Sequence, residues 1–174
     1  QRPPGKGIPT RKVAVLVADG VEMLGLRPVL QALKDAGAIT KIVAPQLGQV
    51  ATATGRQLPV DCTLVNTPSV MFDAVIVAGG ADSVTALAGM GDAVHYVLEA
   101  YKHCKPVCVL GDGVRLLQAL GIQPKADAAA LAAHPGVVLG EGSAEAAPET
   151  AQAFIQAIMA HRHWDRPGAA AVPA

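Results

Sequence analysis

The segment that comes closest to a catalytic motif is Lys105–Leu117, with the sequence KPVCVLGDGVRLL. A continuous apolar run passes through Gly111-Asp112-Gly113 into an amphipathic stretch, which predicts a buried strand, a tight turn and a helix. In open α/β folds, a turn of this kind lies at the carboxyl end of a central strand and can carry a nucleophile. Because the tip of the turn is Gly111, which has no side chain, we predict that no nucleophile projects from it.

The other reactive groups near this turn have simpler structural roles. Asp112 could act as an acid or a base, but we expect it to pair with Arg115 or to cap the following helix through backbone amides. Cys108 lies within the apolar run and is predicted to be an inert core residue. Cys104 lies next to two lysines near the end of a predicted helix, so it is the better candidate for a reactive thiol.

The sequence gives little evidence for a phosphate-binding or metal-binding site. The residues after the first apolar run, Ala18–Met23 (ADGVEM), include two acids and no Ser or Thr, which argues against a phosphate loop. A phospho-acceptor site needs clustered aspartates, whereas we interpret Asp19 and Asp82 as turn and cap residues. His161 and His163 lie two positions apart at the polar end of the last predicted helix. The chain has no HExxH or CxxC motif, so we predict no metal site.

Apolar patterning predicts alternating strands and helices around these residues. A buried strand shows a continuous apolar run, whereas a surface helix has apolar residues three or four positions apart. We predict strands over residues 12–18, 40–44, 74–78, 106–110 and 136–139, and helices over 22–36, 92–103, 114–120 and 148–160. Gly37 is placed to end the first helix. Residues 48–60 predict a hairpin around Thr54-Gly55, and the alanine-rich residues 126–133 are ambiguous.

The alternation of these elements predicts an α/β fold. We expect a flavodoxin-like, doubly wound, mostly parallel sheet with helices on both faces and a small β-hairpin excursion. Residues 1–10 are rich in Pro and Gly and are assigned to an inter-domain linker or arm. Residues 11–165 form the domain, and residues 166–174 form a C-terminal tail.

The overall composition argues against several classes of partner. Lys plus Arg and Asp plus Glu balance at 14 each, so no strong field attracts nucleic acid or an anionic membrane. Aromatic residues make up 3%, too few for the stacking surfaces of a single-strand binder. The longest apolar runs are far shorter than a membrane span. Three cysteines, Cys62, Cys104 and Cys108, form no even disulfide framework and fit a reducing, cytoplasmic location.

The glycine-flanked turn and the order of the predicted strands resemble the DJ-1/PfpI, class I glutamine-amidotransferase-like superfamily. In active members a Cys lies at the turn and a Glu comes from the first helix. The resemblance puts Gly111 at the Cys position and Gly25 at the Glu position. Both functional groups are therefore missing, and Gly111, Asp112, Gly113 and Gly25 mark a vestigial site.

Four further segments resemble the C-terminal domain of large-subunit haem catalases. They are Phe72–Val77 (FDAVIV), Glu99–Val107 (EAYKHCKPV), Leu110–Asp112 (LGD) and Met159–Arg166 (MAHRHWDR). The resemblance implies a non-catalytic domain of a hydrogen-peroxide-decomposing catalase that supports stability, assembly, substrate access or chaperone-like activity. It implies no catalytic residue, cofactor or metal in this chain, with haem bound by upstream domains.

The resemblance to this catalase domain also implies which partners the chain has. They are the catalase core, the sister subunits of a homotetramer and, as possible clients, unfolded proteins. Trp164, between Arg162 and Arg166, has the composition of an interface anchor, and folding back onto its own domain is the alternative. Tyr96 and Tyr101 lie on an amphipathic helix, where packing is the expected role. The alternative function is that of a stand-alone DJ-1/PfpI-type hydrolase, deglycase or chaperone.

Overall fold

The centre of the fold is a parallel six-stranded sheet. The computed structural model describes residues 7–122 and 134–166. The strands follow the order β5-β2-β1-β6-β7-β8, and the five longer ones have the flavodoxin-like order 2-1-3-4-5. Their bounds are β1 Lys12–Leu16, β2 Ile39–Ala44, β5 Cys62–Thr63, β6 Ala74–Val77, β7 Val107–Leu110 and β8 Val137–Gly140. The predicted fold class is confirmed.

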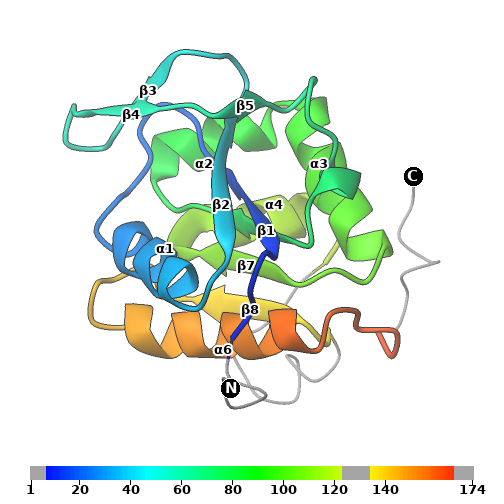
Figure 1. Ribbon diagram of the computed structural model, residues 1–174. Helices are drawn as coiled ribbons and strands as arrows, with labels where there is room; N and C mark the ends of the chain where they lie inside the picture. Colours follow the sequence, from blue (N-terminus) through cyan, green and yellow to red (C-terminus); the bar gives the residue numbers. More distant parts are fainter. Residues whose placement is uncertain (1–6, 123–133, 167–174) are drawn as a thin grey trace.

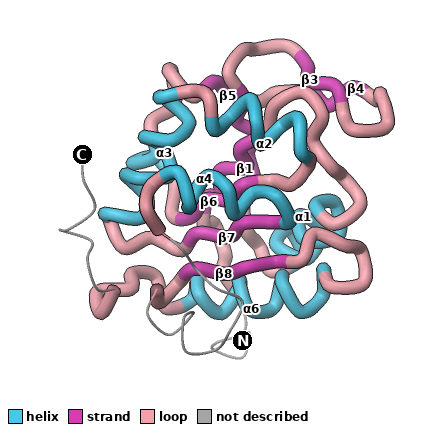
Figure 2. The backbone as a smooth tube through the Cα atoms, turned by 180° about the vertical axis from the view of Figure 1, so that it is seen from behind, coloured by secondary structure: helices cyan, strands magenta, loops and turns pink. Residues whose placement is uncertain are grey.

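Helices cover both faces of this sheet, as Figures 1 and 2 show from opposite sides. Helices α1 (Leu26–Asp35) and α6 (Ala147–Met159) pack on one face, and α2 (Ala81–Ala88), α3 (Gly91–Lys102) and α4 (Val114–Ala119) pack on the other. Val15 of β1 belongs to the first core layer and Leu16 to the second, because successive strand side chains point to opposite faces. A central strand buried on both sides therefore has a continuous apolar sequence.

The predicted hairpin is also present, formed by antiparallel β3 (Gln49–Ala51) and β4 (Gln57–Pro59) at the upper left of Figure 1. The turn after β1 holds it to the sheet: Gly20 donates its N–H to Ala51, and Ala53 donates its N–H to Val21. Asp19 accepts the Ala51 N–H at 2.9 Å, which confirms its role as a turn residue. The hairpin thus stands at the carboxyl ends of the strands.

One predicted boundary was wrong, and two elements were not predicted. The first helix begins at Leu26 instead of residue 22, because the Glu22 N–H bonds to the carbonyl of Gly79 on the neighbouring loop. Helix α2 and the two-residue strand β5 were missed altogether. Only Ser83, Val84 and Leu87 of α2 are buried, a pattern too short to stand out by periodicity. The ambiguous residues 126–133 lie outside the described residues.

Both ends of the described chain pack on the domain. Ile8 is buried, and its N–H bonds to the Ala36 carbonyl, while Thr10 donates to Gly37. Gly37 follows α1 with φ +96°, which confirms the predicted helix end. Arg166, placed at the start of the tail by the sequence analysis, is only 4% exposed. Residues near both ends of the described chain, Ile8 and Arg166, therefore pack against the domain.

Candidate functional site

The strand–turn–helix segment has the geometry expected of a catalytic elbow. Strand β7 leads into a single 3₁₀ turn, Gly111–Gly113, which continues directly into α4. Gly111 has φ +51°, in the left-handed region that side chains disfavour. A Cβ on Gly113 would lie 2.8 Å from the carbonyl oxygen of Val77, so the start of α4 packs tightly against β6. The elbow keeps its backbone shape, and its tip bears no side chain.

Beside the elbow, an open depression of about 470 Å³ lies at the carboxyl ends of the strands. Loops after β1, β6, β7 and β8 and the hairpin supply its wall. Its carboxylates are Glu22, Asp82, Asp112 and Glu141. Their mutual repulsion and acceptor-only chemistry disfavour an anionic ligand in this depression.

Glu22 and Glu141 were not identified as site residues from the sequence. Glu22 was placed inside the first predicted helix, and its Oε1 instead accepts the Leu24 N–H at 2.9 Å in the turn before α1. Glu141 follows the last strand, β8, in a loop that carried no motif. In a parallel sheet, the loops that follow the strands lie at the same edge. The position of Glu22 and Glu141 after predicted strands could therefore have indicated that they lie near the elbow.

Three glycines bring the loop after β8 into close contact with the start of α1 and with the elbow. Gly25 caps the start of α1, and a Cβ on it would collide with the carbonyl oxygen of Gly142. A Cβ on Gly142 would in turn lie 3.1 Å from the Gly111 nitrogen. The backbone of the loop after β8 therefore packs against both positions that the superfamily resemblance assigned to Glu and Cys. With this backbone, no side chain fits at position 25.

Asp112 at the elbow does not make the contacts that we predicted. Asp112 is exposed and makes no side-chain cap hydrogen bond at either the 3₁₀ turn or α4. Arg115 instead donates from Nη1 to the Thr85 hydroxyl at 3.0 Å, because α4 packs beside α2. Asp82 lies in the first turn of α2, where its charge complements the helix dipole.

All three cysteines lie away from the elbow tip. Cys108 is fully buried in β7, and burial raises the pKa of its thiol. Cys104 is also buried, and its thiol points to the Lys102 carbonyl at 3.8 Å. Cys62 is half-buried, and all three are free. The core role predicted for Cys108 is confirmed, and burial of Cys104 removes the access that reactivity needs.

Histidines and tyrosines of the described residues also serve the fold. Among residues 7–122 and 134–166, no cluster of His, Cys, Asp and Glu is arranged to hold a metal ion. His163 bonds through Nε2 to the Ala157 carbonyl at the end of α6. Tyr96 and Tyr101 are buried in the core, and the Tyr101 hydroxyl bonds to Nδ1 of His134 at 2.8 Å. These tyrosines do not fit a haem, because neither has a face or hydroxyl open to a porphyrin.

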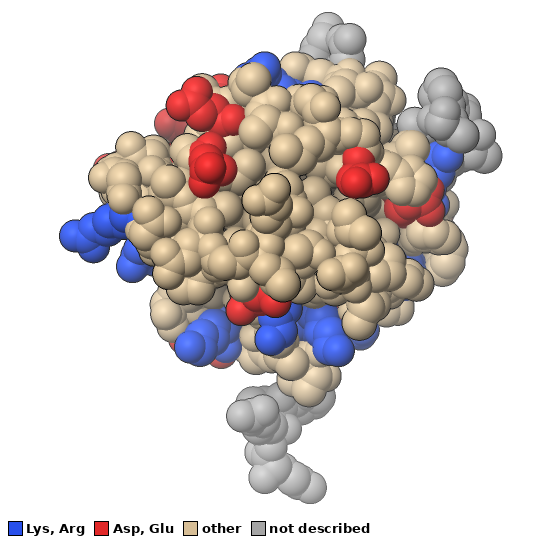
Figure 3. Space-filling model, turned by 90° about the horizontal axis from the view of Figure 1, so that it is seen from above, with Lys and Arg blue, Asp and Glu red and all other residues tan. Residues whose placement is uncertain are grey.

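The surface lacks a large patch of one charge in the view of Figure 3. Acidic residues form small separate groups on a mainly uncharged face, and basic residues lie toward its edges. Within the described ranges, no helix has the length and apolar character needed to cross a bilayer. These observations agree with a balanced net charge.

A doubly wound sheet with an elbow after β7, an inner strand between β6 and β8, defines a DJ-1/ThiJ/PfpI-like fold. The chain superposes on oxidized DJ-1 from Toxoplasma gondii with a TM-score of 0.70 at 15% identity, covering 94% of this chain and 96% of that one. A ThiJ/PfpI domain protein from Brachyspira murdochii gives 0.67 at 17% identity, with 88% and 99% covered. At these identities the likeness concerns the fold alone.

Sequence comparison identifies the family within that fold. Residues 9–167 match the C-terminal domain found in long catalases, and the chain belongs to this family. It is 42% identical over 168 residues to Catalase HPII of Pseudomonas aeruginosa, covering 96% of this chain and 22% of the relative. Identity is 39% to Catalase HPII of Mycobacterium avium and 35% to Catalase-2 of Bacillus subtilis, over 93% and 90% of this chain and 23% and 21% of the relatives. The chain thus spans roughly a fifth of the length of these relatives.

Proposed function

We propose that this chain is a non-catalytic domain of a long, hydrogen-peroxide-decomposing haem catalase and that it supports the stability and assembly of that enzyme. The haem and the peroxide chemistry belong to the other part of the protein. The single observation that carries this proposal is the backbone of Gly142 packed against Gly25, the position to which the superfamily resemblance assigns the Glu. Without a thiol at position 111 and an acid at position 25, the elbow has no nucleophile and acid of its own for acyl transfer.

The partners that we propose follow from the same family assignment. They are the catalase core and the sister subunits of a homotetramer in the cytoplasm, without nucleic acid or membrane. Balanced charge supports the last two exclusions. Substrate access and protection of unfolded proteins are further supporting roles, each testable on the intact enzyme.

A stand-alone hydrolase or deglycase of the DJ-1/PfpI type is the alternative. Such an enzyme needs a thiolate at the elbow, with a neighbouring acid or base. Gly111 provides no thiol, although carboxylates line the depression beside it, and the cysteine in the preceding strand, Cys108, is buried with a raised pKa. The geometry therefore favours the supporting role.

Deletion of the domain from the intact catalase tests the proposal. We expect the shortened enzyme to keep its haem absorbance and its initial peroxide turnover, but to inactivate faster on heating or to lose subunits. Thermal inactivation half-life and oligomeric mass are the two measurements. A shortened enzyme with unchanged half-life and unchanged oligomeric mass contradicts the supporting role. Loss of the haem absorbance band at room temperature contradicts the assignment of haem binding to the other part of the protein.

A further inference from the structure

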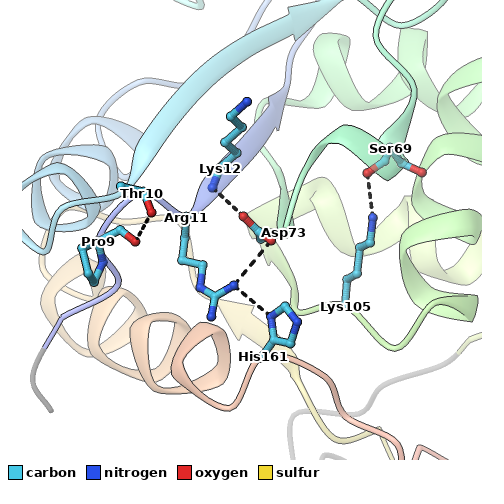
Figure 4. A network of polar contacts seen from close by, with 8 residues as sticks. All are labelled: Pro9, Thr10, Arg11, Lys12, Ser69, Asp73, Lys105 and His161. Carbon is cyan, nitrogen blue, oxygen red and sulfur yellow. Dashed lines mark hydrogen bonds and ion pairs between the residues drawn. The ribbon is translucent and has the colours of Figure 1, made fainter.

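Residues 161–166, which we call the edge segment, cross the edge of the sheet where the strands begin. The segment follows the end of α6, and its His163 N–H bonds to the Cys104 carbonyl at 2.9 Å, shortly before β7. Figure 4 shows His161, the first residue of the segment, directed toward Arg11, which directly precedes β1. Nδ1 of His161 lies 3.1 Å from Nη1 of Arg11. This contact joins the end of α6 to the start of β1.

The edge segment is held more firmly at its end than at its start. Arg166 is buried and donates four hydrogen bonds to carbonyls of the domain. Trp164 is 76% exposed, so its indole does not fold back onto the domain, and Asp165 beside it is exposed as well. The first half of the segment is held by the side chain of His161 and by two hydrogen bonds of His163.

The contact between Arg11 and His161 fixes the protonation state of the imidazole. A guanidinium only donates hydrogen bonds, so Nδ1 of His161 has to accept the bond and carries no proton. The proton of the neutral ring is then on Nε2. Protonation of Nδ1 would place two donors 3.1 Å apart and remove the bond. The contact therefore exists only while His161 is neutral.

The charges that act on His161 oppose its protonation. Partial desolvation first, and then Arg11 and Arg162, lower the pKa of His161, with Asp73 acting in the opposite direction. Asp73 lies 3.7 Å from Arg11 Nη1 and also accepts a backbone N–H at 2.9 Å. Asp165 is not among the groups that act on His161. Protonation would therefore add a third cation beside a carboxylate that is already engaged.

Two other charged side chains drawn in Figure 4 point elsewhere. Lys105 is buried, and its Nζ donates to the Ser69 carbonyl at 2.8 Å. The ammonium group of Lys12 is directed away from His161. His161 is therefore the titratable group whose state decides the contact with Arg11.

We propose that the Arg11–His161 contact is a pH-sensitive attachment, which holds the first half of the edge segment on the domain while His161 is neutral and releases it when His161 is protonated. The sign follows from linkage between protonation and folding. A histidine whose pKa is lowered in the folded chain contributes stability that is complete above its ordinary pKa of about 6.5 and is lost as the pH falls through the lowered pKa. Because Arg166 keeps the end of the segment in place, the release is local. This inference does not depend on the proposed function.

Nitrogen NMR of the imidazole rings in the isotope-labelled chain tests the contact. At pH 8 we expect His161 to carry its proton on Nε2, and we expect its titration midpoint to rise in Arg11→Met. Lys12→Met is the matched control, because it removes a cation from the neighbouring residue and leaves the contact with His161 untouched. It should move the midpoint by less than half as much. A proton on Nδ1 at pH 8, or equal shifts in the two variants, overturns the inference.

Hydrogen exchange of the His163 amide tests the release, because this N–H bonds to Cys104 across the edge. Between pH 7.5 and pH 5, after correction for the intrinsic exchange rate, we expect its protection factor to fall by about two-fold or more. Asp73 stays ionised over this range. In His161→Gln, a side-chain oxygen can accept from Arg11 at every pH, so the protection should not depend on pH.

His95→Gln is the control for the exchange measurement, because His95 is an exposed histidine on α3, and this variant should keep the native pH profile. A constant protection factor in the native chain refutes the release. A fall of the same size in His161→Gln assigns the pH dependence to another group and refutes the role of His161.

Discussion

Replacing Arg166 should destabilise the domain more than its position near the chain end suggests. Its guanidinium donates to the carbonyls of Tyr101 at 2.9 Å, Lys105 at 3.0 Å and Pro135 at 2.9 and 2.7 Å. It also lies 4.4 Å from the centroid of the Tyr101 ring. Burial lowers the pKa of Arg166, but a guanidinium remains charged at neutral pH. One side chain thus joins the end of α3, the start of β7 and the turn before β8.

The size of the effect follows from the acceptors that the substitution abandons. Arg166→Met keeps most of the side-chain length and removes all four donated bonds. The Tyr101 carbonyl keeps the Cys104 N–H at 3.0 Å, so the acceptors that lose their donor are the carbonyls of Lys105 and Pro135. Each buried acceptor left without a partner costs about 1–3 kcal/mol. Water can reach part of this edge, and the variant no longer has to bury a charged group. We therefore expect the free energy of unfolding to fall by roughly 3–5 kcal/mol. For a domain of this size that corresponds to a fall in Tm of roughly 6–20 °C.

Thermal and urea unfolding of the chain, followed by circular dichroism, measure this loss. Arg166→Lys should fall between the native chain and Arg166→Met, because an ammonium keeps the charge but cannot span three carbonyls. Arg115→Met is the control, since Arg115 is exposed and makes one bond to Thr85, and it should change stability by about 0.5 kcal/mol or less. A Tm for Arg166→Met within 2 °C of the control, a margin of about 1 kcal/mol, refutes the reasoning.

Three further predictions concern the elbow, the thiols and haem. Gly111→Cys should create no esterase activity. Gly25→Glu should lower the Tm sharply, because the Cβ of the new side chain meets the Gly142 carbonyl. Esterase activity in the double variant contradicts the argument that the Gly142 backbone blocks position 25. Iodoacetamide should modify the half-buried Cys62 well before Cys108. Raising the pH from 7 to 9 should not remove this difference in rate, because burial holds the pKa of Cys108 above its ordinary value. Equal modification rates of the two thiols, measured by mass spectrometry, disprove this prediction. The isolated chain should neither retain haem through gel filtration nor turn over peroxide, and a surviving Soret band with turnover rejects that prediction.

Local patterns were sufficient for the central architecture. The continuous apolar runs of β1, β6 and β7 predicted strands buried on both faces, and the turn residues at Thr54-Gly55 predicted the hairpin. The lack of a nucleophile at Gly111 also followed from residue identity alone. Short elements such as α2 could not be found this way, because three buried residues form no recognisable period.

The candidate site depended on contacts between loops that are distant in the sequence. Residue type showed that Gly25 lacks an acid, but only the fold showed that the backbone of Gly142 fills the space where one would lie. Likewise, Arg166 was predicted to belong to a tail, whereas its buried bonds to Tyr101, Lys105 and Pro135 make it part of the core. Sequence determines which groups a chain possesses and the periodicity of its elements, since both are local properties. Which groups meet is decided by the parallel sheet, because its crossovers bring successive loops to one edge.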